Sequence, residues 1–143
     1  MIILVIVGLV LTALLVFMWV AVAREPGPGP ADVAIAYERA WDELDFDLLF
    51  DLSGDELRDG MRRDRFVRVK RAAHERAGTP AGIGADIAVE TTVAGTDAAL
   101  VVTRVVAGGD AMRNNVSLER RANGWVVVGY GLRTDPVAGP EPR

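Results

Sequence analysis

The stretch from residue 111 to residue 133 reads AMRNNVSLERRANGWVVVGYGLR, and the fold is predicted from its pattern. Its first part alternates apolar and polar side chains, which is typical of a strand with one buried face. Asn123-Gly124 follows, a dipeptide favoured in tight turns between antiparallel strands. We therefore predict a hairpin of strands 111–121 and 125–133. Alternation in the second strand places four apolar side chains on one face, Val126, Val128, Tyr130 and Leu132.

Two further strand-like runs precede this hairpin. Residues 86–94 alternate in the same way, whereas residues 98–107 are apolar on both faces, which indicates a central strand. Turn-forming triplets separate the runs, Gly95-Thr96-Asp97 and Gly108-Gly109-Asp110. The four runs together predict an antiparallel meander.

The residues before the meander have helical spacing. Asp32 is positioned to cap a helix that begins near Val33, and the spacing of Ser53 and Glu56 matches a capping box. The predicted helices are about three in number: one from Val33, a short one over Phe46–Leu52, and one over residues 63–76. Helices followed by a meander predict an α+β domain over residues 32–134, with the sheet curved around its helices.

Residues 1–23 contain no charged side chain and are apolar except for Thr12. As a helix they would span roughly 34 Å, against a hydrocarbon core of about 30 Å. Trp19 lies near the end of the run, where aromatic side chains favour the membrane interface. We predict one transmembrane helix that binds the lipid bilayer. A cleaved signal peptide is the alternative, since Ala21-Val22-Ala23 resembles a cleavage site.

Residues 24–31 form a predicted linker in which proline and glycine alternate, and residues 135–143 form a predicted disordered tail. The linker reaches at most about 25 Å, so it holds the domain close to the bilayer. Arg24 directly follows the apolar run, and the positive-inside bias then favours a cytoplasmic domain of a single-pass protein in the cell membrane.

The order of elements and two segments carry a resemblance to a known family. These segments are residues 40–53, AWDELDFDLLFDLS, and residues 123–127, NGWVV. They resemble the nuclear-transport-factor-2-like (NTF2-like) cone fold, and in particular small bacterial membrane-anchored members of that superfamily with no assigned activity. The resemblance covers roughly residues 32–134. It implies a cone-shaped fold with an interior pocket, but no single function, because this superfamily contains both enzymes and binding domains.

Few residues offer catalytic or metal-binding chemistry. The chain has no cysteine and one histidine, His74, which lies among charged residues of a helix and is expected on the surface. The acidic stretch is expected to be a solvated helix face with capping residues, at Asp42, Glu43, Asp45, Asp47 and Asp51. We predict no metal site, no cofactor and no catalytic residue, and the enzyme hypothesis is left open with a preference against it.

An isomerase-like site needs a carboxylate base and a tyrosine or acid donor in a pocket. The chain has two tyrosines, and no aspartate occupies an inward strand position. Asn114 shares a strand face with Met112 and Val116, so its amide is a candidate hydrogen-bond donor in the pocket. A residue near the strand end that reaches water is the equal alternative. The candidate ligand-pocket residues are Tyr37, Trp41, Phe66, Asn114 and Tyr130.

Charge is distributed unevenly along the chain. Residues 58–76 carry eight basic and three acidic side chains, whereas residues 24–57 carry two basic and ten acidic ones. A basic patch is predicted to face the membrane or a partner, with a solvated helix as the alternative. It consists of Arg62, Arg63, Arg65, Arg68, Lys70 and Arg71. Nucleic acid is not an expected partner, because the net charge is -4.

Three functional hypotheses follow. The first is a membrane-tethered, non-catalytic module that binds a partner protein or a small apolar ligand. The second is a ketosteroid-isomerase- or cyclase-like enzyme, which requires an Asp or Glu within hydrogen-bond reach of Tyr37 or Tyr130 in a pocket. The third is an accessory subunit of a membrane complex, with residues 1–23 as its main contact surface.

Overall fold

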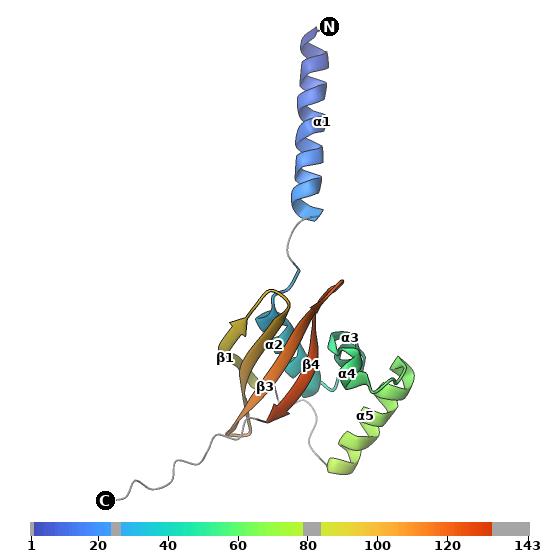
Figure 1. Cartoon of the computed structure of the whole chain (residues 1–143), viewed down its shortest axis with the longest axis vertical. Helices are drawn as coiled ribbons and strands as arrows, with labels where there is room; N and C mark the ends of the chain where they lie inside the picture. The colour runs from blue at the N-terminus through green and yellow to red at the C-terminus, as the bar shows by residue number, and fades with distance from the viewer. Residues whose placement is uncertain (1, 24–26, 79–83, 133–143) are drawn as a thin grey trace, which may run out of the picture.

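The computed structural model describes residues 2–23, 27–78 and 84–132. The described part of the chain contains five helices followed by four strands (Figure 1). The elements are α1 (Ile2–Ala23), α2 (Pro30–Asp42), α3 (Phe46–Leu52), α4 (Asp55–Arg58), α5 (Arg63–Ala77), β1 (Asp86–Ala94), β2 (Ala98–Ala107), β3 (Asp110–Arg121) and β4 (Gly124–Leu132). The predicted α+β class is confirmed.

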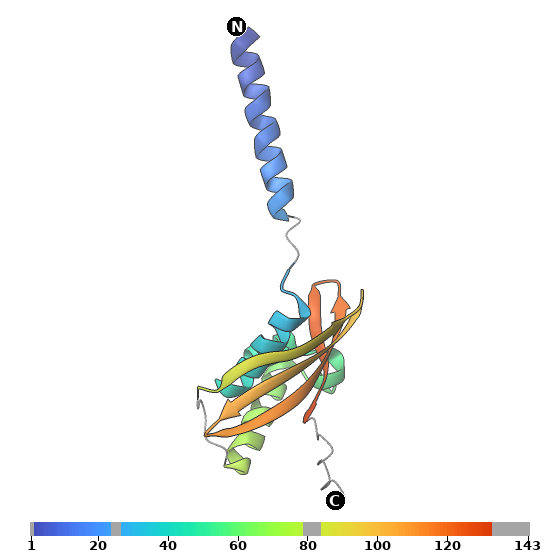
Figure 2. The same ribbon diagram turned by 90° about the vertical axis from the view of Figure 1, so that its left-hand side faces the viewer.

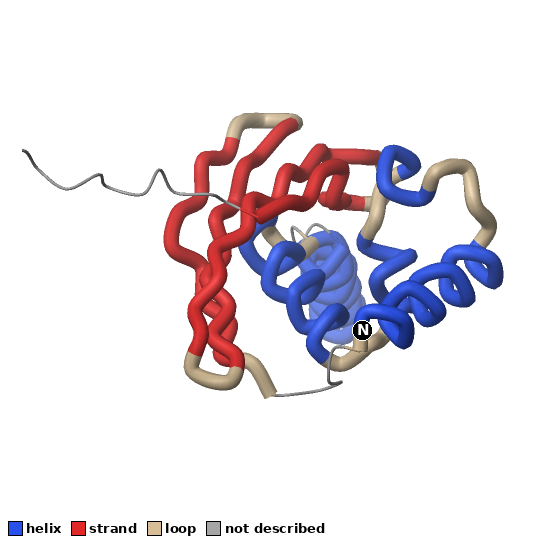
Figure 3. Tube along the Cα trace, turned by 90° about the horizontal axis from the view of Figure 1, so that it is seen from below, coloured by secondary structure: helices blue, strands red, loops and turns tan. Residues whose placement is uncertain are grey.

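The four strands form one antiparallel sheet in the order β1-β2-β3-β4. The central position predicted for residues 98–107 agrees with β2 pairing on both sides. Figures 2 and 3 show the sheet curving along one side of the domain, with α2 in its concave face and the helices α3, α4 and α5 beyond. Helix α5 packs on α3 and not on the sheet. The helices therefore leave part of the concave face of the sheet uncovered.

A bulge in β4 changes which of its side chains face the helices. Val116 pairs with Tyr130 and Leu118 pairs with Val127, so β4 uses one residue more than β3 over this span. Val127 and Tyr130 therefore lie on the same face. Simple alternation had put them on opposite faces, and that prediction was wrong because the extra residue, Val128, reverses the alternation.

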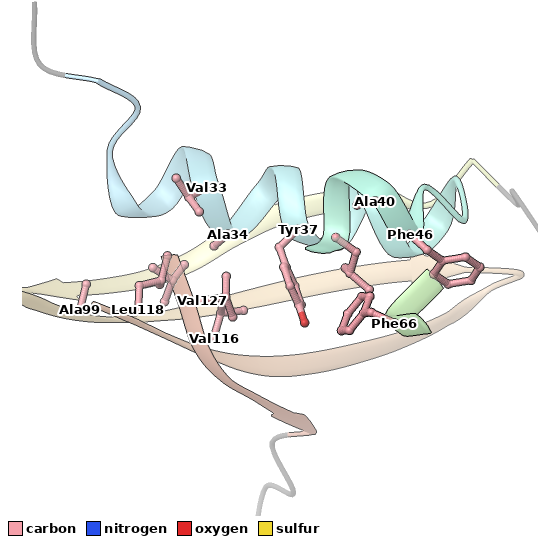
Figure 4. Close-up of a cluster of buried hydrophobic side chains, with 12 residues drawn as sticks. Val33, Ala34, Tyr37, Ala40, Phe46, Phe66, Ala99, Val116, Leu118 and Val127 are labelled. Carbon is pink, nitrogen blue, oxygen red and sulfur yellow. The ribbon is translucent and has the colours of Figure 1, made fainter. Parts of the chain in front are cut away.

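The hydrophobic core lies between α2 and the sheet. Figure 4 shows Val33, Ala34 and Tyr37 directed from α2 toward the side chains of the sheet. The buried apolar side chains of α3 and α5 extend the same cluster. The fully buried members include Leu49, Phe66, Val101, Val116, Leu118 and Val127. Helix α2 supplies one face of this core. The packing of the core therefore determines where the other side chains of α2 meet the sheet.

The starts of two helices differ from their predicted positions. Helix α2 begins at Pro30, two residues inside the predicted linker, and Asp32 accepts a hydrogen bond from the Gly29 backbone N–H at 3.1 Å. Asp32 therefore lies in the first turn and is not the capping residue. Proline is well suited to this first turn, because it has no N–H to satisfy there.

The predicted capping box at Ser53 is also wrong. The Ser53 hydroxyl donates to the Leu49 carbonyl at 2.6 Å, and the short helix α4 starts after Gly54. The Gly54 N–H instead donates to the Val127 carbonyl at 2.7 Å. A side chain at Gly54 would come within 3.1 Å of Val128, so glycine allows the turn between α3 and α4 to lie directly against β4.

The N-terminal helix α1 runs over Ile2–Ala23, and its described side chains are those of residues 7–20. The large apolar side chains in this range are about half to three-quarters exposed, from Val7 to Trp19. Among the described residues, no helix is long and apolar enough to cross a membrane. The transmembrane character of residues 1–23 is thus a prediction only. The predicted tail and residues 24–26 of the linker lie outside the described residues.

Candidate functional site

A glutamate is buried where α2 meets the sheet. The side chain of Glu38 is 4% exposed. Its Oε1 accepts hydrogen bonds from the Thr103 hydroxyl at 2.5 Å and from the Asn114 amide at 3.0 Å. Its Oε2 accepts one from the Tyr130 hydroxyl at 2.8 Å. We call these four residues the Glu38 network.

The three donors come from three different strands, β2, β3 and β4. A carboxylate can only accept hydrogen bonds, and a buried carboxylate is costly unless donors surround it. Within the described ranges no Lys or Arg forms an ion pair with Glu38. Its stabilisation therefore comes from these hydrogen bonds, which also tie α2 to the sheet.

Beside the Glu38 network lies a cleft of about 510 Å³. One wall is a face of α5. Its lining residues follow one another at helical spacing, every third or fourth position: Lys70, Ala73, His74 and Ala77. The other walls come from the end of α2, from the residue before β1 and from the sheet, at Trp41, Asp42, Ala85, Val105, Ala107 and Met112. Glu38, Asn114 and Tyr130 complete the lining. The cleft is thus mainly apolar, with a polar group of residues on one side.

Aromatic rings support this polar group. The Trp41 and Tyr130 rings stack with 6.4 Å between centroids and 20° between planes. The centre of the Tyr37 ring lies 5.2 Å from that of the Tyr130 ring. These contacts hold the Tyr130 hydroxyl at Glu38, although the tyrosine as a whole remains 36% exposed along the cleft.

The sequence-predicted pocket residues fall into two groups. Trp41, Asn114 and Tyr130 line the cleft. Tyr37 and Phe66 are only 3% and 1% exposed and belong to the core behind it. Asn114 lies on the predicted face of β3, and its amide donates to Glu38 and also to the Tyr130 hydroxyl at 3.0 Å.

The side chains of the predicted basic patch make different contacts. Arg63 pairs with Asp47 and Asp51 of α3, and Arg68 pairs with Asp64 at 3.8 Å. Lys70 lines the cleft. The remaining members, Arg62, Arg65 and Arg71, are exposed on or beside α5. The patch is therefore divided between a contact with α3, the cleft wall and the surface.

Two polar residues expected on the surface also line the cleft. His74 is half-buried, with its ring centre 6.5 Å from that of Phe46, so it is partly exposed at the cleft. Asp42 accepts a hydrogen bond from the Ala85 N–H at 3.2 Å, which joins the end of α2 to the residue before β1. Other acidic side chains of this stretch agree with the expectation: Asp45 caps α3 by accepting from the Leu48 N–H at 2.9 Å.

The sequence reasoning missed Glu38 because it searched only the strands for a carboxylate. A signal was present in the helix. Glu38 lies four residues after Ala34 and three before Trp41, so helical spacing places it within the apolar stripe of α2. A charged residue at such a position requires buried hydrogen-bond partners.

Burial raises the pKa of the Tyr130 hydroxyl above its ordinary value, and the negative charge of Glu38 raises that pKa further. Burial also raises the pKa of Tyr37. Both effects have the same physical basis, since a tyrosinate would lose hydration and, at Tyr130, would lie against a carboxylate. The neutral phenol is therefore the stable form of both residues.

Comparison with solved structures gives one informative match. A Campylobacter jejuni protein described as "Putative NTF2-like transpeptidase" superposes with a TM-score of 0.54 and 18% sequence identity, covering 70% of this chain and 97% of that one. The fold is NTF2-like. This confirms the predicted fold resemblance, and at such identity the NTF2-like likeness concerns the fold alone. No protein-family model and no curated protein matches the sequence.

The two tyrosines provide a spectroscopic test of the Glu38 network. We expect neither to ionise in the folded chain at about pH 10, where an exposed tyrosine does. The unfolded chain releases these protons at lower pH than the folded chain, so the free energy of unfolding should fall as the pH rises above about 10. Tyrosinate absorbance, measured against pH together with circular dichroism, should rise only as the fold is lost.

Tyr130→Phe is the matched control, because it removes one of the two shifted groups and keeps the ring. The loss of stability with rising pH should be shallower in this variant. Tyrosinate absorbance that appears at the ordinary pH while the circular dichroism is unchanged would contradict the proposed burial and charge effects.

Proposed function

We propose that this chain is a membrane-tethered, non-catalytic binding module whose cleft takes a small apolar ligand. The observation that carries the proposal is the cleft itself, which combines mostly apolar walls with a few polar side chains, including the hydrogen-bonded carboxylates of Glu38 and Asp42. Small-molecule sites commonly have this composition, with mostly apolar walls and a few placed polar groups. The partner-protein form of the first hypothesis has less support, since the cleft is concave and small.

The state of Glu38 favours binding over catalysis. Both of its oxygens already accept hydrogen bonds, and the Tyr130 hydroxyl is one of the donors. A general base needs a lone pair within reach of the substrate proton. Three of the four lone-pair positions of this carboxylate are occupied and its side chain is 4% exposed, so a substrate proton would have little access to it.

The tether is supported by the N-terminal segment. Residues 1–23 have no charged side chain, and the described apolar side chains of α1 are exposed in the single chain. Exposed apolar side chains on successive turns of a helix favour burial in lipid or against another helix. The cytoplasmic orientation depends on Arg24 and is part of this proposal.

The tether would leave the cleft facing the aqueous phase. Helix α2 begins beside the linker and ends at Trp41 and Asp42 in the cleft wall. Its 13 residues span roughly 20 Å at 1.5 Å per residue. A ligand would therefore enter at the end of the domain away from the anchor.

Membrane fractionation tests the tether. We expect the full chain to stay with the membrane pellet after alkaline carbonate washing and to be released by detergent, because α1 would be buried in lipid. A variant without residues 1–23 should move to the supernatant. Release of the full chain without detergent would contradict the tether.

A second purification distinguishes the accessory-subunit hypothesis. The full chain and the shortened variant are each isolated in mild detergent from membranes of the source cells. A stable partner that is retained only when residues 1–23 are present would favour that hypothesis over an independent binding module.

Filling the cleft tests ligand binding. Ala73 lines the cleft on α5 and is exposed, so Ala73→Trp should occupy the cleft without disturbing the core. We expect this variant to lose binding of 2-phenylethanol, a small apolar alcohol, measured by ligand-detected NMR. Val69→Trp on the same helix is the matched control, because Val69 is 42% exposed and lies outside the cleft lining.

The expected control result is unchanged binding to Val69→Trp. Equal binding to the original chain and to Ala73→Trp would place the ligand elsewhere. No detectable binding to the original chain, tested also with the charged analogues phenylacetate and phenethylamine, would contradict the proposed function.

One observation favours the isomerase- or cyclase-like alternative. That hypothesis required a carboxylate within hydrogen-bond reach of a cleft tyrosine, and Glu38 lies 2.8 Å from the Tyr130 hydroxyl. A ketone oxygen could take the place of Glu38 as acceptor for Tyr130, and the released carboxylate oxygen would then face the ligand. The alternative is therefore kept as the second candidate.

Proton exchange separates the two candidates. An enzyme of this type should speed exchange of the α-protons of cyclohexanone with deuterated water, and Glu38→Gln should abolish the effect because an amide is not a base. NMR of the ketone gives the exchange rate. The non-catalytic proposal expects the same rate with the original chain, with Glu38→Gln and with buffer.

A further inference from the structure

Lys70 is the one lysine of the chain, and its side chain lines the cleft. Its ammonium nitrogen lies 5.6 Å from the centre of the Trp41 ring and 5.3 Å from that of Phe66. Both rings attract a cation through their faces. These contacts hold the charged end of a long, half-buried side chain at the cleft wall.

The Lys70 ammonium has no ion-pair partner among the described residues. The two acidic side chains of the cleft, Glu38 and Asp42, accept hydrogen bonds from neutral protein groups, and neither forms an ion pair with Lys70. Of the other titratable lining residues, Tyr130 donates to Glu38, and His74 lies one turn further along the same face of α5. The cleft therefore contains one cation whose charge a ligand can neutralise.

We propose that Lys70 binds the carboxylate of a small amphipathic acid, whose apolar body lies along the cleft. The inference rests on the proposed function and adds the class of ligand. A hydrogen bond from an ammonium to a carboxylate is stronger than one between neutral groups, and the apolar walls lower the screening by water. Trp41, Ala73 and Met112 provide the surface for the apolar body.

The opposite sign of charge on the ligand is disfavoured by the same contacts. An amine would be repelled by the Lys70 ammonium, and the Glu38 carboxylate that could attract it is buried and already accepts three hydrogen bonds. A neutral alcohol would gain the apolar contacts alone. The expected order of affinity is acid, then alcohol, then amine.

Three probes with the same skeleton test this order: phenylacetate, 2-phenylethanol and phenethylamine. Each is titrated into the full chain in lipid nanodiscs while the fluorescence of Trp41 is followed, with Trp19 and Trp125 replaced by Phe. We expect phenylacetate to bind about tenfold more tightly than 2-phenylethanol, which corresponds to about 1.4 kcal/mol. Lys70→Gln should remove this difference, so that the two ligands bind this variant with equal affinity.

Arg76→Gln is the matched control, because Arg76 is an exposed cation on the same helix outside the cleft lining. It should keep the preference for phenylacetate, and Lys70→Arg should keep most of it. Equal affinity for the acid and the alcohol, or an equal loss in Lys70→Gln and Arg76→Gln, would overturn the role of Lys70 while leaving ligand binding intact. Tightest binding of phenethylamine would assign recognition to Glu38, and binding of none of the three would contradict the proposed function itself.

Discussion

Helix α2 can pack on the sheet only if the Glu38 carboxylate leaves water, and three strands supply the donors that make this possible. An unpaired buried carboxylate costs far more than the net gain from a single hydrogen bond. The donors come from adjacent strands, so α2, β2, β3 and β4 have to be correctly placed together. The bulge in β4 belongs to the same constraint, because it brings Tyr130 to the face that α2 covers.

The cleft follows from this arrangement. Helix α2 ends at the network, and α5 packs on α3 instead of closing over the sheet, so a space remains beside Tyr130 and Asn114. Its walls are apolar because they are the outer part of the core face, whereas its two acidic groups are already hydrogen-bonded. The remaining cation, Lys70, is held by two aromatic rings. A charge at this position is suited to distinguishing ligands by their charge, since a ligand could contact it without any rearrangement of the core.

Much of the fold could be predicted from local pattern. The four strands begin and end within about one residue of their predicted limits, because period-two alternation and glycine turns are local signals. The bulge was missed, since nothing in VVV at residues 126–128 marks which residue is extra. The helix starts were misplaced because Asp32 and Ser53 suit several positions near a helix end, and contacts with Gly29 and β4 decide between them.

The site was predicted less completely. The sequence was sufficient to predict Trp41, Asn114 and Tyr130 as pocket residues. A polar or aromatic side chain on the core-facing side of a strand or helix indicates a pocket without any knowledge of the tertiary structure. Glu38 could have been found only by asking which charged residue occupies an apolar helical stripe. Lys70 and His74 depend on the angle between α5 and the sheet, a tertiary feature without a local signal.

Comparing the unfolding free energies of Glu38→Ala and Glu38→Gln tests the central constraint most directly. Glu38→Gln keeps an oxygen for Thr103 and Asn114 and can donate its amide to the Tyr130 oxygen. Glu38→Ala leaves the Thr103 and Tyr130 hydroxyls without this acceptor and removes one of the two acceptors of the Asn114 amide. Denaturant unfolding of the full chain in detergent should show a loss of about 3 kcal/mol for Glu38→Ala and about 1 kcal/mol or less for Glu38→Gln. Equal and small losses in both variants would contradict the role of the buried carboxylate in holding the fold together.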